Sequence, residues 1–305
     1  MITGEQTDEF IAAHGLPAGF AKLIDEHYIP LSTWILKLER ADETLLIGIN
    51  GAQGTGKSTL ASFLKAALNS KADWRVAVLS IDDFYLTKSE RSELADEIHP
   101  LLGTRGVPGT HDIGMLSDCI DKLVTLDAES TLHLPYFDKA KDDRADKSAW
   151  PATKGPIDLI IIEGWCVGSM PQDASELIEP INALEEREDK TGEWRTFVNE
   201  RLQDDYAQLF ARLDVLVFLQ APGFSAIHRW RLIQEEKLAA AKPEDSSGIM
   251  SSQQLTRFIQ HYERITRNNL AVLPESADVV LEFNDNHDCI RSRYKRESSL
   301  LSDQS

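Results

Sequence analysis

The chain contains little of what marks secreted or zinc-binding proteins. It has three cysteines in 305 residues, Cys119, Cys166 and Cys289, which lie far apart and form no C-x-x-C pair. An odd, scattered count is typical of reduced thiols, so we expect a cytoplasmic protein. The eight histidines form no H-E-x-x-H pair, and the sequence therefore indicates no zinc site.

Long apolar runs and a surplus of basic residues are also missing. No run approaches the ~18 apolar residues of a membrane span, and the N-terminus, MITGEQTDEF, is too polar and acidic for a signal peptide. Lys and Arg number 32 against 50 Asp and Glu, a formal net charge of −18. We therefore expect neither a membrane nor a nucleic acid as partner, because nucleic-acid binding needs a basic stripe. An anionic substrate would need a local cluster of Lys and Arg.

The clearest positive signal is the segment GAQGTGKS, which fits the G-x-x-x-x-G-K-S pattern of a phosphate-binding P-loop. It follows the apolar run TLLIGIN and precedes STLASFLKAAL, whose apolar residues have helical spacing. Glycines let successive backbone N–H groups point inward, and the helix N-terminus adds positive potential. We expect Lys57 to reach the β and γ phosphates of a nucleotide and the Ser58 hydroxyl to bind Mg²⁺. The predicted nucleotide-binding residues are Gly51, Ala52, Gln53, Gly54, Thr55, Gly56, Lys57, Ser58 and Thr59.

Carboxylates follow two other apolar runs. RVAVLSI ends at Asp82 and Asp83, and IDLIII ends at Glu163. Because ligands gather at the carboxyl ends of parallel strands, Asp82 or Asp83 is a candidate base for a hydroxyl that attacks phosphorus. The alternative for this pair is capping of the next helix. Glu163 is a candidate Mg²⁺ ligand of the Walker-B type, or a solvent-facing residue at a strand end.

Two polar segments contain candidate substrate contacts. The stretch HPLLGTRGVPGTHD is a long loop, and long loops are usually functional or disordered. Its Arg105, His111 and Asp112 can contact a polar small molecule, or the loop is a solvated connector. In the charge cluster within 132–150, Lys139, Lys141 and Arg144 are candidates for binding an anionic acceptor, or they belong to a solvated face.

A helix predicted after the run LDVLVFL contains Arg229 and Arg231. Arginines on a mobile helix in this position can close over the phosphates and stabilise a transferring group. The alternative is that they form surface salt bridges with Glu235 and Glu236.

Apolar runs alternate with helical patterns through most of the chain, which predicts an α/β fold with a mainly parallel five-stranded sheet. The strands are predicted at 44–50, 75–81, 157–162, 213–219 and 277–283. Residues 1–40 are expected to form a helical preface and 225–265 a helical lid with a following helix. The charged segment 185–193 is expected to be a surface excursion, and the polar residues 291–305 a loose tail. No linker divides residues 1–305, so we expect a single domain.

Several segments together resemble a known family. GAQGTGKS, SIDDFYLT, GTRGVPGTHD, LPYFDKAKDDR and IIEGWCVG, in this order, look like the D-glycerate 3-kinase group, and VNERLQDDYAQLF and HRWRLIQEEKL are similar too. That group belongs to the phosphoribulokinase, uridine kinase and pantothenate kinase branch of P-loop kinases. The resemblance covers about residues 44–270 and implies one P-loop kinase domain, a three-layer αβα sandwich.

The resemblance also implies roles for residues. It implies ATP as donor, Mg²⁺, and phosphate transfer to a hydroxyl of a small, anionic metabolite. Asp82 takes the position of the catalytic carboxylate, Glu163 the Walker-B position, and Arg229 or Arg231 that of the lid arginine. The substrate side corresponds to Asp83, Tyr85, Arg105, His111, Asp112, Lys139 and Arg144. The chain departs from the family pattern at QHYER (260–264), where a Tyr-x-Pro-x-Tyr-like run would have a proline.

Three functions are consistent with these signals. The first is phosphorylation of D-glycerate to 3-phosphoglycerate. The second is a kinase for a nucleoside or a pantothenate-like alcohol. The third is a nucleotide-dependent switch or assembly factor, which is less favoured because a GTPase would need an N-K-x-D motif and the sequence has none.

Overall fold

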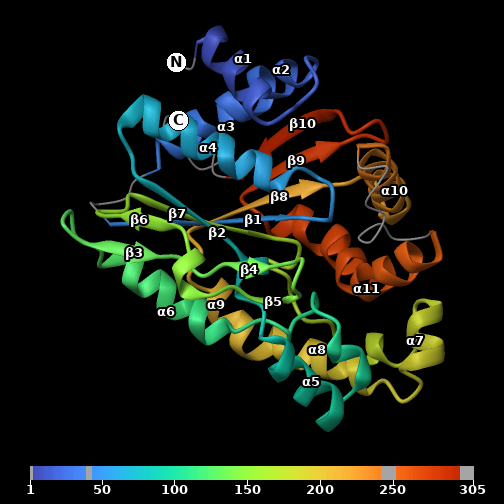
Figure 1. The fold of residues 1–305 in the computed structure, drawn as a ribbon. Helices are drawn as coiled ribbons and strands as arrows, with labels where there is room; N and C mark the ends of the chain where they lie inside the picture. The colour runs from blue at the N-terminus through green and yellow to red at the C-terminus, as the bar shows by residue number, and fades with distance from the viewer. Residues whose placement is uncertain (1–2, 39–42, 242–251, 296–305) are drawn as a thin grey trace, which may run out of the picture.

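A mostly parallel β-sheet forms the centre of the molecule. The computed structural model describes residues 3–38, 43–241 and 252–295. In this part of the chain a six-stranded sheet has the order β10-β9-β8-β1-β7-β2 (Figure 1). Its strands are β1 (Leu45–Gly51), β2 (Val76–Ser80), β7 (Leu159–Gly164), β8 (Val215–Gln220), β9 (Val279–Phe283) and β10 (Cys289–Tyr294).

The five predicted strands are confirmed, and they are the five that run parallel. Every residue of β1 and β7 is buried. Strands covered on both faces read as continuous apolar runs, which is why the sequence shows them clearly. The register places Glu163 of β7 beside Ile49 of β1 and Ser80 of β2. The carboxyl ends of these strands therefore lie at one edge of the sheet.

Helices cover both faces of the sheet and complete the three layers (Figure 1). One face packs against α4 (Lys57–Ala72) and the preface, which comprises α1 (Gly4–Ala13), α2 (Phe20–Leu23), a π-helical segment (Ile24–Tyr28) and α3 (Ile29–Ile35). The other face packs against α6 (Ile113–Val124), α8 (Glu193–Arg201), a π-helical segment (Leu202–Tyr206), α9 (Ala207–Phe210) and α11 (Ser252–Ser276). Each layer buries its own apolar cluster against the sheet.

The remaining elements lie near the carboxyl edge of the sheet or at its periphery. They are α5 (Lys88–Glu97), α7 (Ala183–Glu188), α10 (Phe224–Ala241) and two small antiparallel pairs, β3 (Thr131–His133) with β6 (Ala152–Lys154) and β4 (Phe137–Asp138) with β5 (Asp143–Arg144). Among the described helices, none is long and apolar enough to cross a membrane.

The sixth strand corrects the prediction of a loose tail from Arg291. Residues up to Tyr294 belong to β10, which pairs antiparallel with β9. An edge strand is half-exposed and needs no apolar run, so its sequence, CIRSRY, gives no strand signal. An ion pair of 2.6 Å between Arg293 and Glu282 of β9 adds to the backbone pairing. Residues 296–305 lie outside the described part of the chain.

The charged segment 185–193 is exposed at six of its nine residues, as a surface excursion would be, but two of its carboxylates are buried. Glu185 and Asp189 are both fully buried. Arg264 of α11 contacts both carboxylate oxygens of Glu185, at 2.8 and 2.6 Å. Arg195 pairs with Asp189 at 2.9 Å. Burial of a carboxylate requires such partners, so Glu185 anchors this segment to α11 and Asp189 anchors it to α8.

Candidate active site

The predicted P-loop connects β1 to α4. Gly54 and Gly56 have φ angles of +83° and +92°, which favour glycine and turn the backbone into a cradle. A Cβ at Gly51 would lie 2.5 Å from the Thr55 hydroxyl oxygen, so only glycine fits there. Lys57 begins α4, and its Nζ donates to the Ala52 carbonyl at 3.1 Å. Burial lowers the pKa of the Lys57 ammonium, while the Glu163 and Asp82 carboxylates act in the opposite direction.

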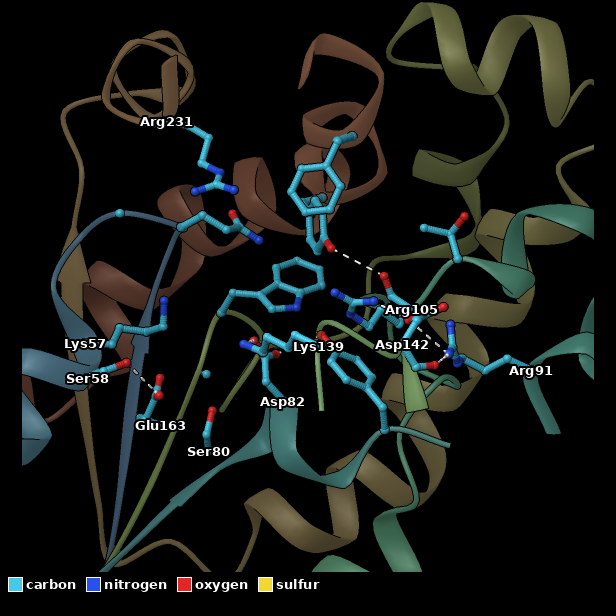
Figure 2. Close-up of a pocket in the computed structure, with 18 of the residues that line it drawn as sticks. Lys57, Ser58, Ser80, Asp82, Arg91, Arg105, Lys139, Asp142, Glu163 and Arg231 are labelled. Carbon is cyan, nitrogen blue, oxygen red and sulfur yellow. Dashed lines mark hydrogen bonds and ion pairs between the residues drawn. The ribbon is translucent and has the colours of Figure 1, made fainter. Parts of the chain in front are cut away.

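Two oxygen ligands for a hard cation lie beside the P-loop. The Ser58 hydroxyl donates to Glu163 Oε1 at 2.8 Å, across the gap between α4 and the end of β7 (Figure 2). Glu163 is buried, and a hydroxyl with a carboxylate is a donor set that suits Mg²⁺. The two residues predicted to bind the metal are therefore in contact with each other.

Asp82 stands at the end of β2, where the chain enters a 3₁₀ turn (Ile81–Phe84). Its carboxylate accepts from the Tyr85 hydroxyl at 2.8 Å and from Lys139 Nζ at 3.0 Å. Burial alone would raise the pKa of Asp82, but Lys139 and the Tyr85 hydroxyl outweigh that effect, and the pKa is lowered. Asp82 is therefore ionised at neutral pH and able to accept a proton.

A cavity of about 630 Å³ joins these groups (Figure 2). The P-loop, Ser58 and Glu163 form one end, Asp82 lies at the middle, and Arg105 with Asp142 and Arg91 forms the other end. Among the described residues that line it, five are basic and three acidic: Lys57, Arg91, Arg105, Lys139 and Arg231 against Asp82, Asp142 and Glu163. The cavity is thus a basic site within an acidic protein.

Five of the residues predicted for catalysis or substrate binding do not line this cavity: Asp83, His111, Asp112, Arg144 and Arg229. Asp83 turns away and accepts from the Phe137 backbone N–H at 3.2 Å. Burial raises its pKa to about 6. Asp112 caps α6 and pairs with Arg144 at 3.1 Å, so these two predicted ligands bind each other. Arg229 pairs with the exposed Asp285, whereas Arg231 lines the cavity.

His111 also differs from the prediction of a substrate contact. It is 4% exposed, stacks on the Tyr85 ring with centroids 4.5 Å apart, and shares a 2.6 Å hydrogen bond with the Tyr206 hydroxyl. Burial lowers its pKa to about 4. Tyr85 lines the cavity, and His111 packs against the face of its ring. The side chains of Glu235 and Glu236, the alternative partners of the arginines, lie outside the described residues.

Sequence reasoning missed several lining residues, which include Ser80, Arg91, Thr104, Asp142, Trp165, Phe258 and Tyr262. Trp165 follows the predicted Glu163, and its indole N–H donates to the Gly106 carbonyl at 2.9 Å. The Tyr262 ring packs edge-on against Trp165. Arg91 and Tyr262 come from helices with no phosphate or metal motif, so only the fold could have placed them there.

The chain is similar in sequence and in fold to proteins named as kinases. The chain is 37% identical over 224 residues to "Uncharacterized kinase mug58" of Schizosaccharomyces pombe, with 71% of this chain and 78% of that protein covered. It is 30% identical over 255 residues to "D-glycerate 3-kinase, chloroplastic" of Arabidopsis thaliana, with 77% of this chain covered but only 52% of that protein. A solved structure of D-glycerate 3-kinase from Cryptococcus neoformans superposes with a TM-score of 0.70 at 25% identity, covering 91% of this chain and 99% of that one. A scan of family models gave no match.

The P-loop, the strand-end carboxylates and the αβα layers define a P-loop kinase. With the sequence similarity just described, the chain belongs to the D-glycerate 3-kinase family and is an ATP-dependent small-molecule kinase.

Proposed function

We propose that this kinase transfers the γ-phosphate of ATP to the 3-hydroxyl of D-glycerate. The observation that carries the proposal is that one cavity adjoins the P-loop, the Asp82 carboxylate and the basic end formed by Arg91 and Arg105. D-Glycerate carries a hydroxyl that can be phosphorylated and a carboxylate that can be recognised. The same cavity offers Asp82 to the hydroxyl and basic side chains to the carboxylate. The names of two relatives, in Arabidopsis thaliana and Cryptococcus neoformans, favour the same acceptor.

In this proposal the P-loop amides and Lys57 hold the nucleotide phosphates. The acceptor hydroxyl oxygen forms a bond to the γ-phosphorus while the bond from that phosphorus to the β–γ bridging oxygen breaks, and ADP leaves. The hydroxyl proton passes to Asp82, which its partners Tyr85 and Lys139 keep ionised. Arg231 is the lid arginine that neutralises charge on the transferring group.

Ser58 and Glu163 are the residues that would hold Mg²⁺. The ion supplies positive charge that offsets the charge on the β and γ phosphates. Glu163 is buried and has little access to water, so a bound cation would stabilise its carboxylate.

The acceptor carboxylate would bind at the basic end of the cavity. Arg105 is the better candidate because a guanidinium offers two parallel N–H donors to a carboxylate. Lys139 already contacts Asp82, so it lies close to where the hydroxyl would react. Arg105 would therefore recognise the acceptor carboxylate, and Lys139 would lie beside the hydroxyl that reacts.

A coupled assay of ADP release tests the proposal. The acceptors would be D-glycerate, glycerol, a nucleoside, pantothenate and a sugar, each at matched concentration with ATP and Mg²⁺. We expect D-glycerate to exceed glycerol, the nucleoside and the sugar in kcat/KM by at least about 100-fold, because a site that recognises a carboxylate rejects analogues that lack one. Pantothenate also carries a carboxylate, so it tests whether the site recognises the rest of the acceptor. A preference for a nucleoside or pantothenate would replace D-glycerate as acceptor. Stimulation by a partner protein alone would favour a nucleotide-dependent switch.

A further inference from the structure

Arg91 connects three separate segments at the basic end of the cavity. It is 1% exposed and is the largest fully buried side chain among the described residues. Its Nε donates to the Leu86 carbonyl at 3.2 Å, Nη1 to the Gly103 carbonyl at 3.1 Å, and Nη2 to the Asp142 carbonyl at 2.7 Å. These acceptors belong to the turn before α5, the loop before Arg105, and the β4–β5 hairpin. Arg91 therefore fixes how the three segments lie relative to one another.

Asp142 links Arg91 to Arg105. Its Oδ1 lies 3.2 Å from Arg91 Nη2 and also accepts from Arg105 Nη1 (Figure 2). Asp142 has a φ of +55°, an uncommon value for a residue other than glycine. The residue thus adopts a strained backbone conformation while its carboxylate bridges the two arginines.

Phe137 of β4 completes the arrangement. The Arg105 guanidinium carbon lies 5.5 Å from the centre of its ring, and that of Arg91 lies 5.8 Å from it. Arg105 is consequently held by an aspartate and an aromatic ring, while the pairing through Nη1 leaves its other N–H groups to meet an anion. Its side chain is 30% exposed, which is enough to reach a ligand in the cavity.

We infer that the pair formed by the buried Arg91 and the partly exposed Asp142 positions Arg105 as the receptor for the acceptor's carboxylate, and so determines which alcohols the enzyme accepts. The inference rests on the proposed function, since it assumes a carboxylate-bearing acceptor. Arg91 and Asp142 are positioning residues, because they act through Arg105. A guanidinium held in one orientation loses less freedom when it binds a carboxylate, so its fixation favours carboxylate acceptors over neutral ones.

The test is a double-mutant cycle on Arg91→Lys and Arg105→Lys, with D-glycerate KM, ATP KM and kcat measured for each variant. Lysine keeps the charge but places all its donors on one nitrogen, so it cannot replace the three separate nitrogens that Arg91 uses for the three carbonyls. We expect Arg91→Lys to raise the D-glycerate KM by about tenfold, leave the ATP KM within about twofold, and add little to the effect of Arg105→Lys. Additive effects, or an equal rise in both KM values, would overturn the inference.

Arg195→Lys is the matched control. Arg195 is also buried, donates to the carbonyls of Leu177, Ile178 and Asp189, and pairs with an aspartate, but it does not line the cavity. We expect Arg195→Lys to lower the melting temperature without changing the ratio of the D-glycerate KM to the ATP KM. If it shifts that ratio as Arg91→Lys does, the effect of Arg91 is a general loss of stability and the inference is wrong.

Asp142→Asn gives the result if Arg91→Lys fails to fold, because asparagine tolerates a positive φ and keeps an acceptor oxygen. We expect the D-glycerate KM to rise by about fivefold while the KM of glycerol stays unchanged. A lower D-glycerate KM would mean that Asp142 competes with the substrate for Arg105, which contradicts a positioning role. If the wild-type enzyme does not phosphorylate D-glycerate, the proposed function fails first, and that result is visible before any variant is compared.

Discussion

Asp82 and Asp83 are adjacent in sequence but lie in opposite environments. Asp82 faces the cavity, and its partners lower its pKa despite burial. Asp83 turns to the Phe137 backbone, and burial raises its pKa to about 6. The sequence left open which of the two is the base, because neighbours at a strand end differ only in the direction of the side chain. The geometry favours Asp82.

Replacement of Asp82 tests its role directly. We expect Asp82→Asn to lower kcat by about two or more orders of magnitude, because a positioned base is lost, while ATP binding is retained. Stopped-flow or steady-state kinetics with calorimetric ATP titration measures both. Asp83→Asn is the matched substitution one residue away, and we expect it to keep most of the activity. Retained activity in Asp82→Asn would remove Asp82 from the mechanism.

The pH dependence separates the two carboxylates as well. The pKa of Asp83 rises from 3.8 to about 6 on folding, so the folded state binds this proton more tightly than the unfolded state does. Its contribution to the free energy of unfolding is therefore present at low pH and is lost as pH rises from about 4 to 6. Asp83→Asn should remove this part of the pH dependence in denaturant titrations. An unchanged profile would contradict the assignment.

Arg229 and Arg231 can also be distinguished. Arg231 lines the cavity, whereas Arg229 pairs with the exposed Asp285. We expect Arg231→Ala to lower kcat by about 100-fold, the loss typical of one charge-stabilising donor. Arg229→Ala should change kcat little, since an exposed ion pair contributes little. Equal losses in both variants would show that α10 contributes through its fold and not through Arg231.

Among the secondary-structure elements, the sequence predicts the strands that are covered on both faces of the sheet. It does not predict the polar edge strand or the charged residues that are buried in ion pairs. The five parallel strands are apolar runs and were found. The edge strand β10 is polar and was not. The charge of segment 185–193 predicts a surface segment, and most of it is exposed, yet Glu185 is buried against Arg264, which lies 79 residues further along the chain. No local pattern carries information about such a distant partner.

The buried pair of α7 and α11 makes a prediction about stability. Glu185→Gln leaves the Arg264 guanidinium without its counter-charge, and we expect it to lower the free energy of unfolding by about 3 kcal/mol. Glu186→Gln, at the exposed neighbouring position, should change it by less than about 0.5 kcal/mol. Urea titrations of both variants give the comparison. Equal, small effects would mean that the pair contributes nothing net to folding.

The whole molecule has a formal net charge of −18, but its cavity is lined by more basic than acidic residues. Of the predicted nucleotide-binding residues, Gln53, Gly54, Lys57 and Ser58 line this cavity, and the sequence indicates them together because the P-loop is a contiguous motif. The acceptor end was identified only in part. Arg105 and Lys139 line it, but Asp112 and Arg144 neutralise each other, and His111 lies beneath Tyr85. This end of the cavity is lined by side chains of distant segments, so its composition depends on packing that a linear pattern does not contain.

The most direct test of the account is to identify the product by ³¹P and ¹³C NMR after incubation with ATP, Mg²⁺ and D-glycerate. We predict one phosphorylated product, 3-phosphoglycerate, formed in equal amount to ADP. The reason is that Arg105 would hold the acceptor carboxylate at the basic end of the cavity, so that the primary hydroxyl faces Asp82. Phosphate on the 2-hydroxyl, or ADP formed with free phosphate and no phosphorylated glycerate, would contradict it.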